Sequence, residues 1–328
     1  MFRHRNEFPV EGQLPALDGA TAWVNSEPVA AGDLHGRVVL ISFGTYTCIN
    51  WIRSLPYVRA WVDKYARQGL VVIGVQTPEF EFEEELDGVS VAMKEMDVRY
   101  PVAVDNDYAV WQAFDNHYWP ALYFVDAEGH IRHHRFGEGE YEESERVLQM
   151  LLAEAGVDVD RSLVQLEPQG VELPADWRGL RSAENYVGYG RAEGFTSPGG
   201  PVLDERHRYT APSSLRLNQW ALTGDWRMGP VATVLEEAGG TISYNFHARD
   251  LHLVMRPAVA HASVRFQLRV DGQPPGLVHG IDIDDDGNGT VSHPRLYQLV
   301  RQRDPISDRV FEIEFLDGGV EAYAFTFG

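Results

Sequence analysis

The sequence predicts two domains, an α/β layer with a partly parallel sheet followed by an all-β antiparallel sandwich or jelly roll. In the first half of the chain, short apolar runs alternate with segments of helical periodicity, a pattern typical of βαβ units. In the second half, apolar and polar residues alternate with a period of two between turns rich in Gly and Asp. A length of 328 residues suits two domains, and a hydrophobic content of 44% is enough to fill both cores.

The first predicted strand covers residues 38–44, a continuous apolar run that is typical of a strand buried on both faces. A helix over residues 50–68 is predicted next, because apolar residues recur on one of its faces. These residues are Tyr57, Val58, Trp61, Val62 and Tyr65. Pro56 lies inside this helix and is expected to kink it or to start a second segment. Gly69 is expected to end it.

The other elements of the first domain follow from shorter patterns of the same two kinds. Apolar runs predict further strands over residues 70–75, 100–105, 121–126 and 130–136. Helical stretches are predicted over residues 82–96, 108–114 and 140–154. The sequence Ala127-Glu128-Gly129 is a turn, so the last two strands are expected to form a hairpin. These elements place the first domain, the α/β layer, at residues 1–156.

The periodic pattern of apolar residues ends after the first domain. Residues 157–185 contain Pro168, Gly170 and Pro174 and hold no sustained period, so they are predicted to be a linker packed between the domains. Residues 186–328 are predicted to form the β-sandwich, which is built from several short strands. The clearest alternating runs lie at residues 242–246, 264–270, 311–315 and 323–327.

The charge balance excludes some classes of partner. The chain carries 28 Lys and Arg against 49 Asp and Glu, a net charge of −21, and an acidic surface repels nucleic-acid phosphates and anionic lipid. We therefore expect no nucleic-acid partner. The acidic residues clustered over 79–87 are predicted to form a solvated face. No run approaches the roughly 20 apolar residues of a membrane span. No secretory signal is seen, so a cytoplasmic location is expected.

Cys48 is the single cysteine, so neither an intrachain disulfide nor a Cys-rich zinc site is expected. It lies between a buried strand and a predicted helix. The N–H groups and the dipole at a helix N-terminus favour a thiolate, which is the nucleophile in disulfide exchange and in peroxide reduction. From spacing alone, Cys48 is equally compatible with a buried and inert cysteine.

The sequence predicts no cofactor and no metal site. Residues 282–289 resemble the start of a calcium loop, but His293 occupies the position that requires a bidentate Glu, so a polar turn is the better interpretation and a calcium site of another kind is the alternative. His133 and His134 are adjacent in a strand, which directs their side chains to opposite faces. In the second domain, some aromatic residues could stack on sugar rings, and packing between the domains is the alternative for them. They are Tyr186, Tyr189, Trp220 and Trp226.

The segment Thr45–Tyr57, with the sequence TYTCINWIRSLPY, resembles the active-site loop and helix of thioredoxin-like proteins of the AhpC/TSA redoxin family. Within that family it is most similar to the soluble region of DipZ-type, TlpA-like proteins. Further similar segments are residues 74–80, 100–103, 119–121, 137–139, 295–299 and 322–328. The resemblance implies a thioredoxin-like fold followed by a β-sandwich similar to a carbohydrate-binding module. It also makes an extracytoplasmic location the alternative to a cytoplasmic one.

The resemblance implies roles for residues near the cysteine. It places Cys48 at the attacking position, and Trp51 stands where the family carries the second cysteine of a Cys-x-x-Cys motif. Pro120 matches the cis-proline that faces the cysteine in thioredoxin folds, so Trp119 and Pro120 are expected near Cys48. Gln76 stands where relatives often have His. The implied catalytic residues are Cys48, Trp51 and Pro120, and the implied substrate-binding residues are Tyr46, Asn50 and Trp119.

Three functions fit these residues. The preferred one is thiol–disulfide exchange by Cys48. The expected partner is a protein disulfide or a small thiol or peroxide substrate. An external thiol would then resolve the mixed disulfide, because Trp51 cannot. Arg53 is expected either to support the thiolate or to lie exposed on the helix. The first alternative is a catalytically degenerate redoxin that acts as a protein- or glycan-binding module. The second is a thiol peroxidase, because Thr45-x-x-Cys48 is similar to the peroxiredoxin motif.

Overall fold

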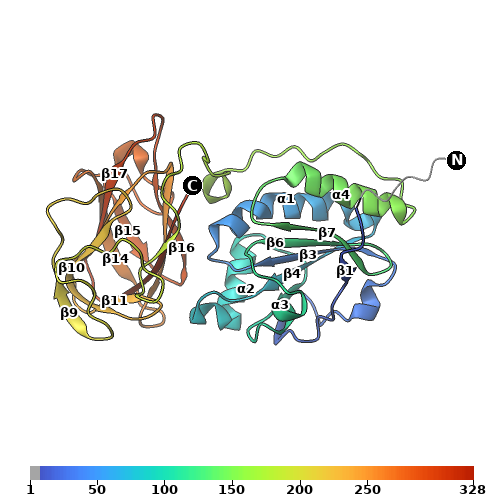
Figure 1. The fold of residues 1–328 in the computed structure, drawn as a ribbon, viewed down its shortest axis with the longest axis horizontal. Coiled ribbons are helices and arrows are strands. Elements are labelled where there is room, and N and C mark those ends of the chain that lie inside the picture. Colours follow the sequence, from blue (N-terminus) through green and yellow to red (C-terminus); the bar gives the residue numbers. More distant parts are fainter. Residues whose placement is uncertain (1–7) are drawn as a thin grey trace. The chain divides into compact units, whose positions relative to one another are not determined.

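The computed structural model of the chain describes residues 8–328. These residues form two units, and the chain passes from the first to the second between Leu173 and Pro174 (Figure 1). The order of elements confirms the predicted fold class, with α/β structure in the first unit and only β-strands with short 3₁₀ turns in the second. Within the described part of the chain, no helix is long and apolar enough to cross a membrane.

The segment predicted as a linker, residues 157–185, is divided between the two units. Its first part packs on the first unit, where the Val164 N–H donates a hydrogen bond to Glu145 (2.9 Å). Its last part joins the second unit, where the Arg181 N–H donates to the backbone oxygen of His247 (2.9 Å). A backbone N–H of each part therefore finds its acceptor in the unit to which that part is attached, a carboxylate in the first unit and a backbone oxygen in the second.

The first unit is built on a seven-stranded sheet with the order β1-β7-β6-β3-β4-β5-β2. The strands are β1 (Gly12–Gln13), β2 (Ala22–Val24), β3 (Val38–Gly44), β4 (Leu70–Gln76), β5 (Val102–Val104), β6 (Ala121–Val125) and β7 (His130–Phe136). The central strands β3, β4 and β5 are parallel, β6 is antiparallel to β3, and β7 is antiparallel to β6. The sequence does not predict β1 and β2, because two or three residues are too few to show a period.

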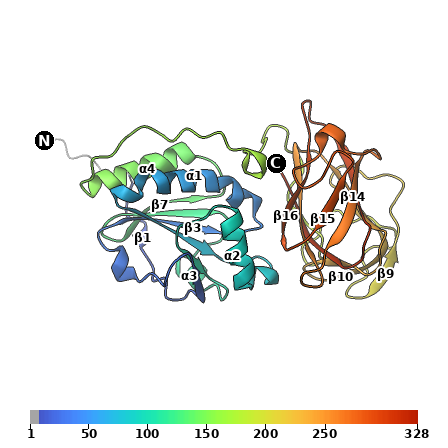
Figure 2. The same ribbon diagram turned by 180° about the vertical axis from the view of Figure 1, so that it is seen from behind.

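Helices lie on both faces of this sheet. They are α1 (Ile49–Tyr65), α2 (Leu86–Glu95), α3 (Ala109–Ala113) and α4 (Tyr141–Glu154). α1 and α4 cover one face, and α3 lies on the other (Figures 1 and 2). The stretch predicted as one helix over residues 82–96 is a 3₁₀ turn (Glu81–Glu84) followed by α2.

Helix α1 positions the cysteine. Cys48 is its N-cap residue with an extended backbone, and its carbonyl oxygen accepts the first helical hydrogen bond from the Ile52 N–H (3.0 Å). The helix continues through Pro56, so no second segment starts there. A 3₁₀ turn (Ala66–Gln68) follows, and Gly69 ends it with φ at 96°, as the sequence predicts.

The second unit is an all-β domain of eleven strands. They are β8 (Asn185–Tyr186), β9 (Arg206–Tyr209), β10 (Trp220–Met228), β11 (Thr233–Leu235), β12 (Gly240–Phe246), β13 (Asp250–Pro257), β14 (Val264–Val270), β15 (Asn288–Val291), β16 (Arg295–Arg301), β17 (Arg309–Phe315) and β18 (Val320–Phe327). Strand β10 belongs to both layers, because residues 220–223 pair with β12 and residues 226–228 pair with β11. Gly224, with φ at 99°, lies at the changeover, where a residue with a Cβ would be strained.

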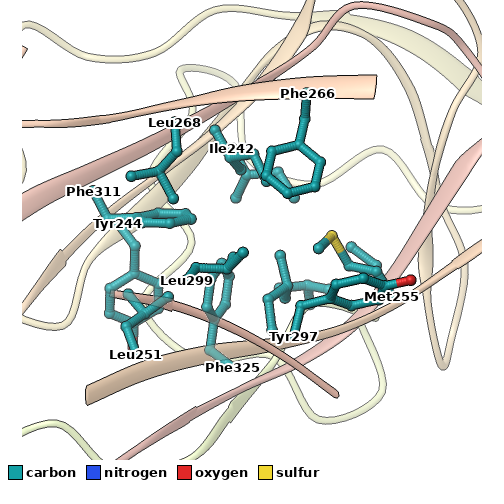
Figure 3. Packing of buried hydrophobic residues seen from close by; sticks show 14 of the residues in the cluster. Ile242, Tyr244, Leu251, Met255, Phe266, Leu268, Tyr297, Leu299, Phe311 and Phe325 are labelled. Atoms are coloured by element: carbon teal, nitrogen blue, oxygen red, sulfur yellow. The ribbon is translucent and has the colours of Figure 1, made fainter. Parts of the chain in front are cut away.

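The core of the second unit lies between these two layers. Figure 3 shows Ile242, Tyr244, Phe266, Leu268 and Phe311 of one layer facing Leu251, Met255, Tyr297, Leu299 and Phe325 of the other. Trp220 and Trp226 also belong to this core and are fully buried, so the prediction that they could stack on sugar rings is wrong. Among the other candidates, the ring of Tyr186 lies 3.4 Å from the guanidinium of Arg191.

A buried charge stabilises one end of strand β13. Asp250 is fully buried and forms ion pairs with Arg301 and Arg249, each with a shortest N–O distance of 2.6 Å. Burial alone would raise the pKa of Asp250, but the hydrogen bonds and charges of its basic partners hold that pKa below its usual range. The ion pairs therefore favour the folded state at neutral pH.

Candidate redox site

The loop between β3 and α1 presents the thiol. Strand β3 and the three residues that follow it are buried, and Cys48 is the first residue with a partly exposed side chain. The Cys48 N–H donates to the backbone oxygen of Thr45 (3.0 Å), which closes a tight turn. A helix of 17 residues begins immediately afterwards. Its first N–H groups and its dipole favour negative charge on the sulfur.

The predicted partner of this loop lies beside it. The Trp119–Pro120 peptide bond is cis, and Cys48 Sγ lies 3.9 Å from the backbone oxygen of Trp119. The expectation that these two residues lie near the cysteine is confirmed. The indole of Trp119 is fixed by a hydrogen bond from its Nε1 to the backbone oxygen of Thr77 (3.1 Å) and by contact with the ring of Trp111. The backbone beside the thiol is therefore held in place by side-chain packing.

By the resemblance to thioredoxin-like proteins, Trp51 is expected at the position of a second cysteine. It lies in the first turn of α1, three residues after Cys48, and its side chain is 3% exposed. The indole covers Gly44 at the end of β3 so closely that a Cβ at Gly44 would overlap its ring. The buried indole N–H has no hydrogen-bond partner in the described structure. Packing rather than hydrogen bonding therefore holds the ring.

The other two residues implied to bind substrate differ in their placement. Asn50, the second residue of α1, is partly exposed. Tyr46 is only 2% exposed, and its hydroxyl donates to the backbone oxygen of Phe82 (3.4 Å). The ring of Tyr46 therefore packs on the turn after β4, and its hydroxyl is used within the unit.

The acidic run over residues 79–87 is not a uniformly solvated face. Glu83 is fully buried, while Glu81, Glu84 and Glu85 are exposed as predicted. The Glu83 carboxylate accepts hydrogen bonds from the hydroxyl of Thr47 (2.7 Å) and from three backbone N–H groups. Burial raises the pKa of Glu83 above its usual range, although these hydrogen bonds act in the opposite direction. A buried acidic group thus contacts the residue that precedes Cys48.

A second polar contact holds the same loop at its start. Gln76 ends β4, and its Nε2 donates to Oγ1 of Thr45 (2.8 Å). Both side chains are buried. The loop of Thr45 to Cys48 is therefore tied at Thr45 to β4 and at Thr47 to the turn after β4.

Arg53 is buried, which contradicts the expectation that it could lie exposed on the helix. Its side chain is 1% exposed, and its Nη1 pairs with Oε1 of Glu138 (3.1 Å). Burial raises the pKa of Glu138 above its usual range, and the charge and hydrogen bond of Arg53 oppose this effect. The Glu138 loop also contacts the cis-proline, since the Gly137 N–H donates to the backbone oxygen of Pro120 (2.9 Å). The ion pair of Arg53 with Glu138 therefore links α1 to this loop.

Among residues 8–328, one group has the composition of a metal site, on the β6–β7 turn. It consists of Asp126, Glu128 and His130. The Oδ1 atom of Asp126 accepts the N–H groups of Glu128 (3.1 Å) and His130 (2.8 Å), and its Oδ2 pairs with Arg132 (3.1 Å). These contacts give the carboxylate a structural role in the hairpin turn.

Comparison with known proteins agrees with this geometry. A model described as the AhpC/TSA family matches residues 11–134, and one described as the thioredoxin-like C-terminal domain matches residues 182–328. The thiol-disulfide oxidoreductase YkuV of Bacillus subtilis is 32% identical over 141 residues, which cover 43% of this chain and 95% of YkuV. This chain belongs to the thioredoxin-like AhpC/TSA family. It is thus a member of a family of thiol–disulfide oxidoreductases.

The redoxin also has a relative that matches both of its units. Protein DipZ of Mycobacterium tuberculosis is 32% identical over 326 residues, which cover 97% of this chain but 43% of DipZ. The redoxin therefore spans less than half the length of that relative. A solved solution structure of a thioredoxin-like protein in the oxidized form is 32% identical, covers 44% of this chain and 96% of the solved one, and has a TM-score of 0.40.

Proposed function

We propose that this redoxin carries out thiol–disulfide exchange with Cys48 as its single reacting thiol. The observation that carries the proposal is the position of Cys48, which is partly exposed at the N-terminus of α1 and lies beside the backbone of Trp119. Trp51 occupies the place of a resolving thiol, so the second step needs a thiol from outside the chain.

The proposed reaction has two balanced steps. The Cys48 thiolate attacks one sulfur of a protein disulfide, so the Cys48–sulfur bond forms, the substrate disulfide breaks, and the other substrate sulfur leaves as a thiolate. A small external thiolate then attacks the mixed disulfide and releases the Cys48 thiolate. The substrate leaves as a disulfide with the external thiol. A second equivalent of that thiol reduces this product and becomes oxidised to its own disulfide.

The remaining site residues have supporting roles in this proposal. The backbone of Trp119, held by the cis bond to Pro120, would align an extended substrate segment next to the sulfur. Asn50, which is partly exposed two residues after Cys48, would contact that segment from α1. Trp51 would hold the start of α1 in place, because its buried indole packs against Gly44 at the end of β3.

The test is the rate at which iodoacetamide alkylates Cys48 as a function of pH, in native protein and in denaturant. The proposal expects a native midpoint well below the value of about 8.5 of an ordinary thiol. It also expects a stable mixed disulfide with a peptide disulfide, which a small thiol such as glutathione releases. Cys48→Ser is the matched control and should abolish both signals.

The other outcomes decide between the alternatives. A thiol that reacts only in denaturant would exclude exchange chemistry and leave the binding-module function. Consumption of hydrogen peroxide with formation of a sulfenic acid at Cys48, at a rate above that of disulfide exchange, would favour the thiol peroxidase.

A further inference from the structure

The carboxylate of Glu83 has more hydrogen-bond donors around it than its own turn requires. Its Oε2 accepts the N–H groups of Glu79 (2.7 Å) and Phe80 (3.0 Å), which caps the 3₁₀ turn Glu81–Glu84. Its Oε1 accepts the hydroxyl (2.7 Å) and the N–H (3.3 Å) of Thr47, 36 residues earlier in the chain. One half of the carboxylate thus serves the local turn, and the other half reaches the loop that carries the cysteine.

This set of donors is specific for a carboxylate. Three of the four donors are backbone N–H groups, which cannot accept a proton in return. An ionised carboxylate offers acceptor sites to all four donors. A glutamine would place its NH₂ group where one of the two oxygens lies, and this group is itself a donor, so the two donors at that position would lose their acceptor. The side chain is fully buried, so water cannot replace a lost partner without a rearrangement of the turn.

A structural cap for the turn alone does not require this arrangement. Glu83 is the N3 residue of a capping box on this turn, which accounts for its hydrogen bond with the Phe80 N–H, but burying a carboxylate is costly. The contacts with Thr47 and the Tyr46 hydroxyl bond to Phe82 (3.4 Å) are what join the turn to the loop before Cys48. The free energy needed to bury the Glu83 carboxylate is therefore associated with its hydrogen bonds to Thr47, which connect the turn after β4 with the loop before Cys48.

We propose that Glu83 is a positioning residue for the Cys48 thiol, acting through its hydrogen bonds to Thr47. This inference rests on the proposed exchange function of Cys48. By fixing Thr47, the carboxylate fixes the backbone that places the sulfur at the N-terminus of α1 and beside the Trp119 carbonyl. Loss of the link lets the loop move, so both the stabilisation of the thiolate and its alignment with a substrate disulfide decrease.

Glu83 lies among other acidic groups whose charges act on a neighbouring phenol. The phenol of Tyr108 has a pKa raised by burial and then by the charges of Glu83, Glu79, Glu84 and Asp105. These four acidic groups therefore act on the same region from the turn after β4 and from the loop after β5. A pH profile must compare variants that change the charge with variants that leave it intact.

Four variants separate positioning from charge and from folding. Glu83→Gln removes the charge and one acceptor, and Thr47→Val removes only the hydroxyl donor. Thr47→Ser restores that donor on a smaller side chain. Glu84→Gln is the matched control, because it removes the same charge from an exposed position of the same turn. The readout is the pH profile of the reaction between native protein and 5,5′-dithiobis(2-nitrobenzoic acid), together with the melting temperature.

If Glu83 positions the thiol, its loss should lower the rate constant that the reaction with 5,5′-dithiobis(2-nitrobenzoic acid) reaches at high pH, where Cys48 is fully ionised. Glu83→Gln and Thr47→Val are expected to lower it by about tenfold or more, the scale at which small misplacements affect reactions. In Thr47→Val, which keeps every charge, the midpoint should also move to higher pH. Thr47→Ser should recover most of the rate, and Glu84→Gln should follow the unchanged protein.

Two results would overturn the inference in different ways. If Glu83→Gln and Thr47→Val melt earlier but keep the plateau rate and the midpoint of the unchanged protein, Glu83 serves the fold alone, and the proposed function stands. If Cys48 of the unchanged native protein does not react, both the inference and the proposed function fail. Should Glu83→Gln not fold, Thr47→Val decides, because it leaves the cap on Glu79 and Phe80 intact.

Discussion

Replacing Trp51 with cysteine tests whether the site retains the geometry of a dithiol redoxin. Trp51 follows Cys48 by three residues at the start of α1. Cys48 is the N-cap residue and Trp51 the third residue of α1, and side chains at these two positions lie close together at the start of a helix, so a modest adjustment brings two thiols to bonding distance. Trp51→Cys is therefore expected to form an intrachain disulfide under oxidised glutathione. It should also catalyse the reduction of insulin by dithiothreitol.

The same change has a cost in stability that follows from packing. Loss of a buried aromatic side chain such as Trp51, which is 3% exposed, costs about 3–5 kcal/mol. Removal of its unpartnered indole N–H offsets about 1–3 kcal/mol of this, the penalty of a buried donor without an acceptor. A net loss of roughly 2 kcal/mol corresponds to a decrease in the melting temperature of about 4–8 °C for a domain of this size.

Insulin turbidity, thiol counting and circular dichroism measure these effects together. The control is Trp51→Phe, which keeps an aromatic ring and adds no thiol, so it should melt close to the unchanged protein and show no gain in insulin reduction. A folded Trp51→Cys protein that keeps both thiols reduced under oxidised glutathione would refute the dithiol geometry. An unchanged melting temperature would refute the claim that the indole fills this part of the core.

Three further changes test the packing and the charges. Glu138→Gln leaves Arg53 buried without a counter-charge, so urea unfolding should show a free energy of unfolding lower by about 3–5 kcal/mol. A decrease below about 1 kcal/mol, the value for a surface salt bridge, would mean that the pair is solvated. Gly44→Ala should cost about 1–3 kcal/mol by overpacking, but much less when combined with Trp51→Ala, and additive losses would contradict their contact. Asp250→Asn should destabilise the protein at pH 7. Because the folded pKa of Asp250 is depressed, its stabilisation is present above the unfolded pKa and disappears as the pH falls through the folded pKa. Thermal unfolding from pH 7 to acid should therefore show the two proteins converging, and a constant difference would contradict the assignment.

The elements that position the cysteine could be predicted from the sequence because their signals are local. The apolar run of β3, the periodic face of α1 and the stop at Gly69 each depend on neighbouring residues, and the structure confirms them. Trp119 and Pro120 are placed near Cys48 by the family resemblance, since 71 residues separate Trp119 from the cysteine and no periodicity connects them.

The buried charges could not be predicted in this way. Glu83 lies in a run of acidic residues whose composition is typical of a solvated face, and only its partners across the fold show why one member is buried. The alternation of Phe80 and Phe82 with acidic residues was the available signal that part of the run faces inward. Arg53 was ambiguous for the same reason, because Glu138 is 85 residues away in sequence.

Strand β10 has a consequence for how the second unit unfolds. One continuous strand is paired with β12 in one layer and with β11 in the other. The two layers therefore cannot separate unless β10 loses its backbone hydrogen bonds to one of them. The β10 amides are therefore expected to exchange with solvent only in the global unfolding event. Trp220 and Trp226 lie on the two sides of Gly224, each paired with a different layer. Because the chain has eight tryptophans, the change in fluorescence lost in Trp220→Phe or in Trp226→Phe would isolate each position, and coincident transitions at both would be the signature of a single cooperative unit.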